Sequence, residues 1–187
     1  MFSLLPFARS KKCSLEDFYY YLLYFNFILI VMDDLSDLYQ DIILSHYKNP
    51  HNEGDLDPHT GEAEGFNPLC GDRLKVFCRQ AEDGKGDLEA VTFTGEGCAI
   101  SKASASIMTS AVKGKSIEEV EKKVAEVMGL LTDPDEPEID LMTMGDLAAL
   151  AGVRKFPARI KCATLAWHAL LAALKDEAAV STEAEEA

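Results

Sequence analysis

The sequence predicts an α+β fold, because segments with helical periodicity stand on both sides of one pair of segments with strand periodicity. Apolar and polar side chains alternate over residues 73–80 and again over 88–94, and a turn at 81–86 joins them into a hairpin. Helical spacing of apolar residues precedes the hairpin at 36–47 and recurs after it. A chain of 187 residues, 48 % of them hydrophobic, is long enough for one domain with a buried core.

The first predicted helix covers residues 36–47 and is capped by Ser36 or Asp37. Its apolar positions recur at steps of three and four, which places the following residues on one face: Leu38, Tyr39, Ile42, Ile43 and Tyr47. Asn49 ends the helix, because a residue that precedes proline disfavours helical backbone. Residues 51–66 are polar and contain glycine, so we expect a loop there.

More helices are predicted between the hairpin and the C-terminus. Residues 100–112 form a helix of small residues, and Ser116 begins another, with Glu119 three residues later in the pattern of a capping box. An acidic loop that contains proline follows at 131–139. The last two helices are expected at 147–151 and from Pro157 to about residue 175.

The first 31 residues differ in composition from the rest of the chain. Residues 18–31 carry a single polar side chain, but a membrane span needs about 20 apolar residues. A signal peptide ends in small residues, whereas Asp33 and Asp34 follow here directly. We therefore expect residues 1–31 to be an upstream extension, with a membrane anchor, an interfacial helix or a core helix as alternatives. The rest of the chain divides into one domain and a disordered acidic tail, residues 32–177 and 178–187.

Charge and cysteine content exclude several classes of function. The formal net charge is −14 and the sequence pI is about 4.6, so the surface repels nucleic acid backbones and anionic membranes. Five cysteines, an odd number, argue against a disulfide framework. We therefore expect a cytoplasmic protein whose reduced thiols bind metal or carry out chemistry.

Three of the five cysteines stand where a predicted element meets a loop. Cys70 precedes the first strand of the hairpin, Cys98 lies between the second strand and a helix, and Cys162 lies near the start of the last helix. Such boundaries gather side chains at one edge of a scaffold. By contrast, Cys78 falls on the apolar face of a strand and is expected in the core, and Cys13 lies in the upstream extension.

The spacing Cys70-Gly71-Asp72 points to a metal site. Gly71 permits a tight turn, after which the thiolate and the carboxylate can reach one ion. Together with Cys98 and Cys162 they make four candidate ligands, the number that tetrahedral zinc prefers. No CxxC pair is present, so the spacing by itself also fits cysteines that are buried as small hydrophobic residues.

The charges around these residues predict a reactive site. Three thiolates and one carboxylate around Zn²⁺ leave a net negative charge, which Arg159 and Lys161 on either side of Cys162 would offset. Neighbouring positive charges also lower the pKa of a thiol. A carboxylate suits zinc less well than sulfur does, so a site that includes Asp72 should release a ligand more easily than a site of four cysteines.

Four segments resemble the U-type iron–sulfur cluster assembly family, and they occur in the family's order. The segments are YQDIILSHYKNPHNEG, NPLCGDRL, GEGCAISKASASIM and ARIKCATLAWHAL, and the resemblance extends over about residues 33–177. Within the family the chain is similar to the SufU branch, because 64 residues separate Cys98 from Cys162 and Lys161 stands where IscU-type cluster scaffolds carry histidine.

The resemblance implies a SufE/NifU-like fold, with a three-stranded antiparallel sheet packed with about five helices and a third strand near residues 61–66. It implies sulfur transfer, in which Cys70 accepts persulfide sulfur from a PLP-dependent cysteine desulfurase and Arg159 stabilises the persulfide. A desulfurase histidine would take over the zinc and free the Cys70 thiolate. Downstream cluster-assembly proteins would be further partners of the chain. The implied zinc ligands are Cys70, Asp72, Cys98 and Cys162.

Three alternatives stay open at this point. The same four ligands would serve a scaffold that assembles an iron–sulfur cluster transiently. A structural zinc module that binds partner proteins is the second alternative, which the Asp72 ligand disfavours. A zinc hydrolase or deaminase is the third, and it needs a P-C-x-x-C pair of ligands, which the sequence lacks.

Overall fold

The structure is a computed structural model, and it describes residues 37–81, 86–133 and 141–182. The chain divides into two compact units, Met1–Asp37 and Leu38–Ala187, and the description below concerns the second. The predicted extension at 1–31 lies outside the described residues, as does most of the acidic loop. Among the described residues, no helix is both long enough and apolar enough to cross a membrane.

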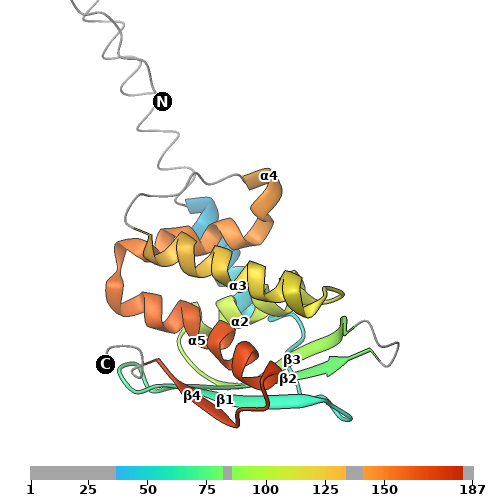
Figure 1. Ribbon diagram of the computed structural model, residues 1–187. Helices are drawn as coiled ribbons and strands as arrows, with labels where there is room; N and C mark the ends of the chain where they lie inside the picture. The colour runs from blue at the N-terminus through green and yellow to red at the C-terminus, as the bar shows by residue number, and fades with distance from the viewer. Residues whose placement is uncertain (1–36, 82–85, 134–140, 183–187) are drawn as a thin grey trace, which may run out of the picture. The chain divides into compact units, whose positions relative to one another are not determined.

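Four strands form one mixed sheet in the order β3-β2-β1-β4 (Figure 1). β1 spans Gly61–Asn67, β2 spans Asp72–Gln80 and β3 spans Leu88–Glu96, and each pairs antiparallel with the next. The predicted hairpin of β2 and β3 is therefore confirmed, and so is the third strand that the family resemblance implied. β4 spans Ala179–Ser181 and pairs parallel to β1.

The expected three-stranded antiparallel sheet is wrong, because β4 adds a parallel strand at its edge. Its residues come from the segment 178–187, which the sequence analysis assigns to a disordered tail. The open edge of β1 supplies the hydrogen bonds: the Glu64 amide donates to the Ala178 carbonyl at 3.0 Å, and the Thr182 amide donates to the Phe66 carbonyl at 3.2 Å. Three residues are too few to show strand periodicity, so only the pairing with β1 defines this strand.

Most helices lie where the sequence predicts them, with small shifts at their ends, whereas α4, Leu141–Met144, was not predicted. Residues 37–48 are helical, the expected capping box joins Ser116 and Glu119, and Pro157 is the first residue of the last helix. The short helix predicted at 147–151 is part of a longer 3₁₀ helix, η1. The labelled helices are α2 Ala99–Val112, α3 Ile117–Thr132, α4 Leu141–Met144, η1 Gly145–Lys155 and α5 Pro157–Leu174.

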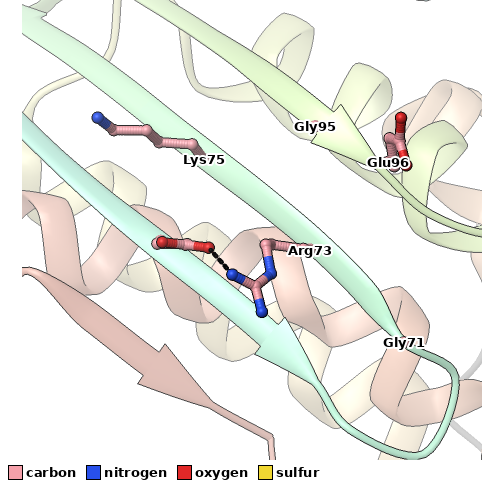
Figure 2. A pocket seen from close by; sticks show the side chains of 6 residues that line it. Gly71, Arg73, Lys75, Gly95 and Glu96 are labelled. Carbon is pink, nitrogen blue, oxygen red and sulfur yellow. Dashed lines mark ion pairs between the residues drawn. The ribbon is translucent and has the colours of Figure 1, made fainter.

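The helices cover one face of the sheet, and the core lies between the two layers (Figure 1). α5 packs on β1 and β2, whereas α2 packs on β3 and on α5. Fully buried side chains come from both layers, and the largest of them include Trp167, Phe93, Leu74, Leu165 and Leu170. The opposite face of β2 carries the charged residues Arg73 and Lys75 (Figure 2).

α5 approaches β1 closely because two glycines stand on the inner face of that strand. A Cβ atom at Gly65 would lie 3.0 Å from the Leu165 side chain, and one at Gly61 would collide with the carbonyl oxygen of Ala173. Glycine in a strand commonly marks such a close approach of another element. This packing brings the beginning of α5, and with it Cys162, to the end of β1.

Candidate metal centre

The turn between β1 and β2 carries Cys70. Residues 68–71 form this turn, and a 2.8 Å hydrogen bond from the Gly71 amide to the Asn67 carbonyl closes it. Gly71 has a φ of 73°, a left-handed conformation that glycine adopts without strain, as the sequence analysis predicts. The turn leaves Cys70 exposed and leads directly into Asp72, which is buried.

Cys162 meets both of these residues from α5. It is buried, and its Sγ atom lies 3.2 Å from the Sγ atom of Cys70. One candidate ligand atom from each of Cys70, Asp72 and Cys162 lies within 4.8 Å of the other two. The fold thus brings together a turn and a helix whose cysteines are 92 positions apart in the sequence.

Cys98 joins the group through Asp72. It is the N-cap residue of α2, and its sulfur accepts a hydrogen bond from the Ser101 amide at 3.5 Å. The Cys98 amide donates to Asp72 Oδ1 at 2.8 Å, and the Cys98 sulfur lies 3.5 Å from Asp72 Oδ2. The structure therefore brings Cys70, Asp72 and Cys162 into one group and places Cys98 against Asp72, while the binding of a metal by these four residues stays a prediction.

The thiols of this group differ in acidity. A hydrogen bond from the Cys162 thiol lowers the pKa of Cys98 to about 7, and the Ser101 amide adds to this against the opposing effect of burial. The same hydrogen bond raises the pKa of Cys162, because its proton is held by the Cys98 sulfur, and burial raises it further. In the metal-free state, Cys98 therefore ionises more readily than Cys162.

The donor set fits zinc. Thiolate sulfur and carboxylate oxygen are both zinc ligands, and four of them make the tetrahedral set. The ligand atoms of Cys70, Asp72 and Cys162 lie within 4.8 Å of one another, close enough to share a single ion with bonds of about 2.0–2.3 Å, and the Cys98 sulfur adjoins them beside Asp72. Asp72 is also oriented by a backbone group, because one of its two carboxylate oxygens accepts a hydrogen bond from the Cys98 amide.

Comparison with known proteins identifies the family. The family described as NifU-like N terminal domain matches residues 38–163, which is more than half of the chain. The chain belongs to this family. The match includes every residue of the four-ligand group as well as Arg159.

Two relatives show which members this NifU-like chain is similar to. It is 45 % identical over 138 residues to the zinc-dependent sulfurtransferase SufU of Bacillus subtilis, covering 73 % of this chain and 89 % of that protein. It is 40 % identical over 149 residues to the iron–sulfur cluster assembly scaffold protein IscU of Streptococcus pyogenes, covering 80 % of this chain and 90 % of that protein. The family is thus that of the IscU and SufU proteins of iron–sulfur cluster assembly.

A solved structure agrees with the fold. The N-terminal part of a nitrogen-fixing NifU-like protein from Brucella abortus superposes with a TM-score of 0.63 at 22 % identity. The likeness covers 82 % of this chain and 99 % of that one. At this identity the comparison concerns the fold alone, and it supports the α+β architecture described above.

Arg159 stands beside the site on the same helix as Cys162. Arg159 lies three positions before Cys162, which places the two on one side of α5. Arg159 is exposed, and its guanidinium carbon lies 4.7 Å from the centre of the Phe156 ring in a cation–π contact. The structure thus places Arg159 one helical turn before Cys162 with its guanidinium against Phe156, and its contact with a persulfide stays a prediction.

Sequence reasoning missed Asn67. This last residue of β1 is fully buried, and its side-chain amide lies 3.3 Å from the Cys162 sulfur. A buried amide needs hydrogen-bond partners, so its position at the centre is significant. The sequence holds one usable signal: Asn67 precedes Pro68, and an Asn-Pro pair is typical of the beginning of a turn.

A shallow hollow of about 410 Å³ lies beside the turn on the outer face of the sheet (Figure 2). Arg73 forms a 3.2 Å ion pair with Glu64, and Lys75 forms one of 2.8 Å with Glu62. Because both cations already have partners within the sheet, the hollow does not present a free cationic site. Its lining consists of Glu64, Gly71, Arg73, Lys75, Gly95 and Glu96.

Proposed function

We propose that this chain accepts persulfide sulfur from a PLP-dependent cysteine desulfurase and delivers it to iron–sulfur cluster assembly in the cytoplasm. The observation that carries the proposal is an exposed thiol, Cys70, grouped with Asp72 and Cys162 at the end of the sheet, with Cys98 placed against Asp72. The 45 % identity to a zinc-dependent sulfurtransferase supports the same reading.

Cys70 is the thiol best placed to receive sulfur. Cys162 is buried; Cys70 and Cys98 are both exposed, but Cys98 is held by the α2 N-terminus, whereas Cys70 lies in a turn. Its thiolate attacks the outer sulfur of the desulfurase persulfide, a new S–S bond forms on Cys70, and the desulfurase cysteine leaves as a thiolate. The exchange conserves electrons, so it needs no external oxidant or reductant.

The four-ligand group would hold zinc in this protein. Bound zinc would keep the ligating thiols deprotonated at neutral pH. Two backbone amides hold members of the four-ligand group in place. The Cys98 amide orients Asp72, and the Ser101 amide orients the Cys98 sulfur. Cys70 lacks such a helix anchor, which suits a thiol that must meet a partner.

Arg159 is proposed to stabilise the transferred sulfur. A persulfide on Cys70 is anionic at neutral pH, and arginine keeps its positive charge at all physiological pH values. Its place on α5, three residues before Cys162, brings that charge to the side of the centre. Contact with Phe156 limits the positions of the long side chain.

A cluster scaffold is the second candidate function. Three sulfur atoms and one carboxylate converge, and such a group could hold iron as cargo. The relative from Streptococcus pyogenes, named as a cluster assembly scaffold, favours this candidate. Lys161 disfavours it, because it occupies the position before Cys162 where IscU-type scaffolds are expected to have histidine.

Desulfurase turnover distinguishes these two functions. A cysteine desulfurase with PLP and cysteine is assayed for alanine release, with the zinc-loaded chain or its Cys70→Ala variant added. We expect strong stimulation by the parent, little or none by Cys70→Ala, and one added sulfur on the Cys70 peptide by mass spectrometry. Cys78→Ala is the matched control, because Cys78 is buried in β2 away from the centre.

The opposite result has a definite meaning. If neither the parent nor Cys78→Ala stimulates alanine release, sulfur transfer is wrong and the cluster scaffold becomes the better function. If Cys70→Ala stimulates as strongly as the parent, Cys70 is not the acceptor.

A further inference from the structure

Asn67 has an unusual environment for an amide side chain. It is the last residue of β1, has 0 % of its surface exposed and points into the layer between sheet and helices. An amide buried without hydrogen-bond partners destabilises the folded protein. Its hydrogen bonds therefore show what the position requires.

The hydrogen bonds determine the orientation of the amide. The Leu69 backbone amide donates to Asn67 Oδ1 at 3.2 Å, so the side-chain oxygen faces the turn that carries Cys70. The nitrogen then faces the other way, and it donates to the Cys162 sulfur at 3.3 Å. A reversed amide would lose both bonds, because it would place a donor against the Leu69 amide.

The neighbouring packing explains why this side chain reaches both elements. Asn67 pairs across the hairpin with Asp72, so it sits at the base of the turn. Gly65, two residues earlier on the same face, lets α5 come close to the strand. The distance from the end of β1 to Cys162 is therefore spanned by one short amide side chain.

We propose that Asn67 is a positioning residue of the metal centre, which joins the turn of Cys70 to the sulfur of Cys162. Its Oδ1 atom shapes the turn, and its N–H group orients the Cys162 sulfur and stabilises negative charge on it. This inference rests on the proposed role of Cys162 as a metal ligand. It adds a residue that touches no metal and that no cysteine pattern in the sequence reveals.

Replacement by aspartate separates the two hydrogen bonds. In Asn67→Asp one oxygen still accepts from the Leu69 amide, while the atom that faces the Cys162 sulfur changes from a donor to a second acceptor. The matched control is Asn52→Asp. Asn52 donates a comparable amide bond of 3.0 Å to Thr109, near the end of α2 that is remote from Cys98.

Two measurements on the full chain test the proposal. Zinc affinity is measured by competition with a chromophoric chelator, and the sulfur environment is read from the thiolate-to-metal charge-transfer band after loading with cobalt(II). We expect Asn67→Asp to weaken zinc binding about 10- to 100-fold, as is typical when a residue that orients a ligand is lost. We also expect its cobalt band to move to lower energy, because a sulfur without an N–H donor gives up an electron more easily. Asn52→Asp should match the parent in both.

The results of these measurements can refute the positioning role of Asn67 without refuting the proposed function, and the reverse. If the parent binds metal and Asn67→Asp has the same affinity and band as the parent, the positioning role is wrong whatever the desulfurase assay shows. If the affinity and band change but the parent transfers no sulfur, the positioning role holds and the sulfur-transfer function fails. Should Asn67→Asp not fold, Asn67→Ser provides the test, because serine retains an acceptor for the Leu69 amide and loses the amide donor.

Discussion

Cys78 and Cys98 carry the same thiol, yet the fold gives them opposite acidities. Cys78 lies inside β2 with 1 % of its surface exposed, and burial raises its pKa to about 11. Cys98 lies at the N-cap of α2, where hydrogen bonds from the Cys162 thiol and the Ser101 amide lower its pKa to about 7. The first is a small hydrophobic residue of the core, and the second is a nucleophile or a ligand.

The difference shows what an element boundary contributes. Inside a strand both backbone groups are paired with neighbouring strands, and burial of the Cys78 side chain outweighs the one hydrogen bond that it shares with Thr60. At a helix N-terminus the first amides have no partner within the helix, so they can bind a thiolate. The three cysteines of the proposed centre all lie at or near such boundaries, and Cys78 does not.

The largest expected difference between Cys98 and Cys78 is in their rates of alkylation. At pH 7 about half of Cys98 but only about one Cys78 in ten thousand would be thiolate, and the thiolate is the reactive form. Iodoacetamide should therefore modify Cys98 at least about a thousandfold faster than Cys78 in the metal-free protein. Peptide mass spectrometry over time measures both rates in one sample.

A pH series sharpens this test. The rate at Cys98 should rise through a midpoint near pH 7, while Cys78 stays unmodified until the protein unfolds. Similar rates for the two residues in the folded protein would contradict the assignment of Cys78 to the core. In urea the two rates should become equal, which serves as the control.

Alanine substitution should separate the roles of the two cysteines in metal binding. Cys98→Ala removes one proposed ligand, so zinc affinity should fall by about a hundredfold or more. Cys78→Ala should leave zinc affinity within about threefold of the parent and lower the free energy of unfolding by roughly 1 kcal/mol through a small cavity. Chelator competition and urea denaturation measure the two quantities, and equal zinc affinities for the two variants would refute the proposed ligand set.

The raised pKa of Cys78 predicts a loss of stability at high pH. Its pKa is higher in the folded state than its ordinary value of 9.0, so its contribution is present below pH 9 and is lost as the pH rises through about 11. A shift of this size corresponds to roughly 2–3 kcal/mol. Urea denaturation of the metal-free protein at pH 8 and pH 10.5 should show a smaller decrease for Cys78→Ala than for the parent, and parallel decreases would argue against this origin.

The smallest expected effect concerns the contact that holds the two helices of the centre together. The Ser104 hydroxyl accepts from the Trp167 indole at 3.0 Å and donates to the Ala163 carbonyl at 2.5 Å. Ser104→Ala should lower the free energy of unfolding by about 1–2 kcal/mol, because it leaves the buried indole N–H unpaired. Ser110→Ala, at an exposed position of the same helix, should have almost no effect in the same denaturation experiment.

Much of the fold could be predicted from the sequence because its signals are local. Alternation predicted β2 and β3, the Ser116–Glu119 capping box predicted the beginning of α3, and Pro157 marked the beginning of α5. β1 was found only through the family resemblance, because its inner face consists of Gly61, Ala63, Gly65 and Asn67, which do not alternate as apolar residues do. β4 could not be predicted, since its pairing depends on the free edge of β1.

The sequence by itself determined which residues are able to bind a metal. Cys70 and Asp72 flank a glycine that must turn, and Cys98 and Cys162 stand at element boundaries, so the candidates follow from residue type and position. Only the tertiary structure decided the distances between them and the part played by Asn67. Those depend on the close approach of α5 to β1 and on the placement of α2 beside α5, which are long-range contacts that no local pattern encodes.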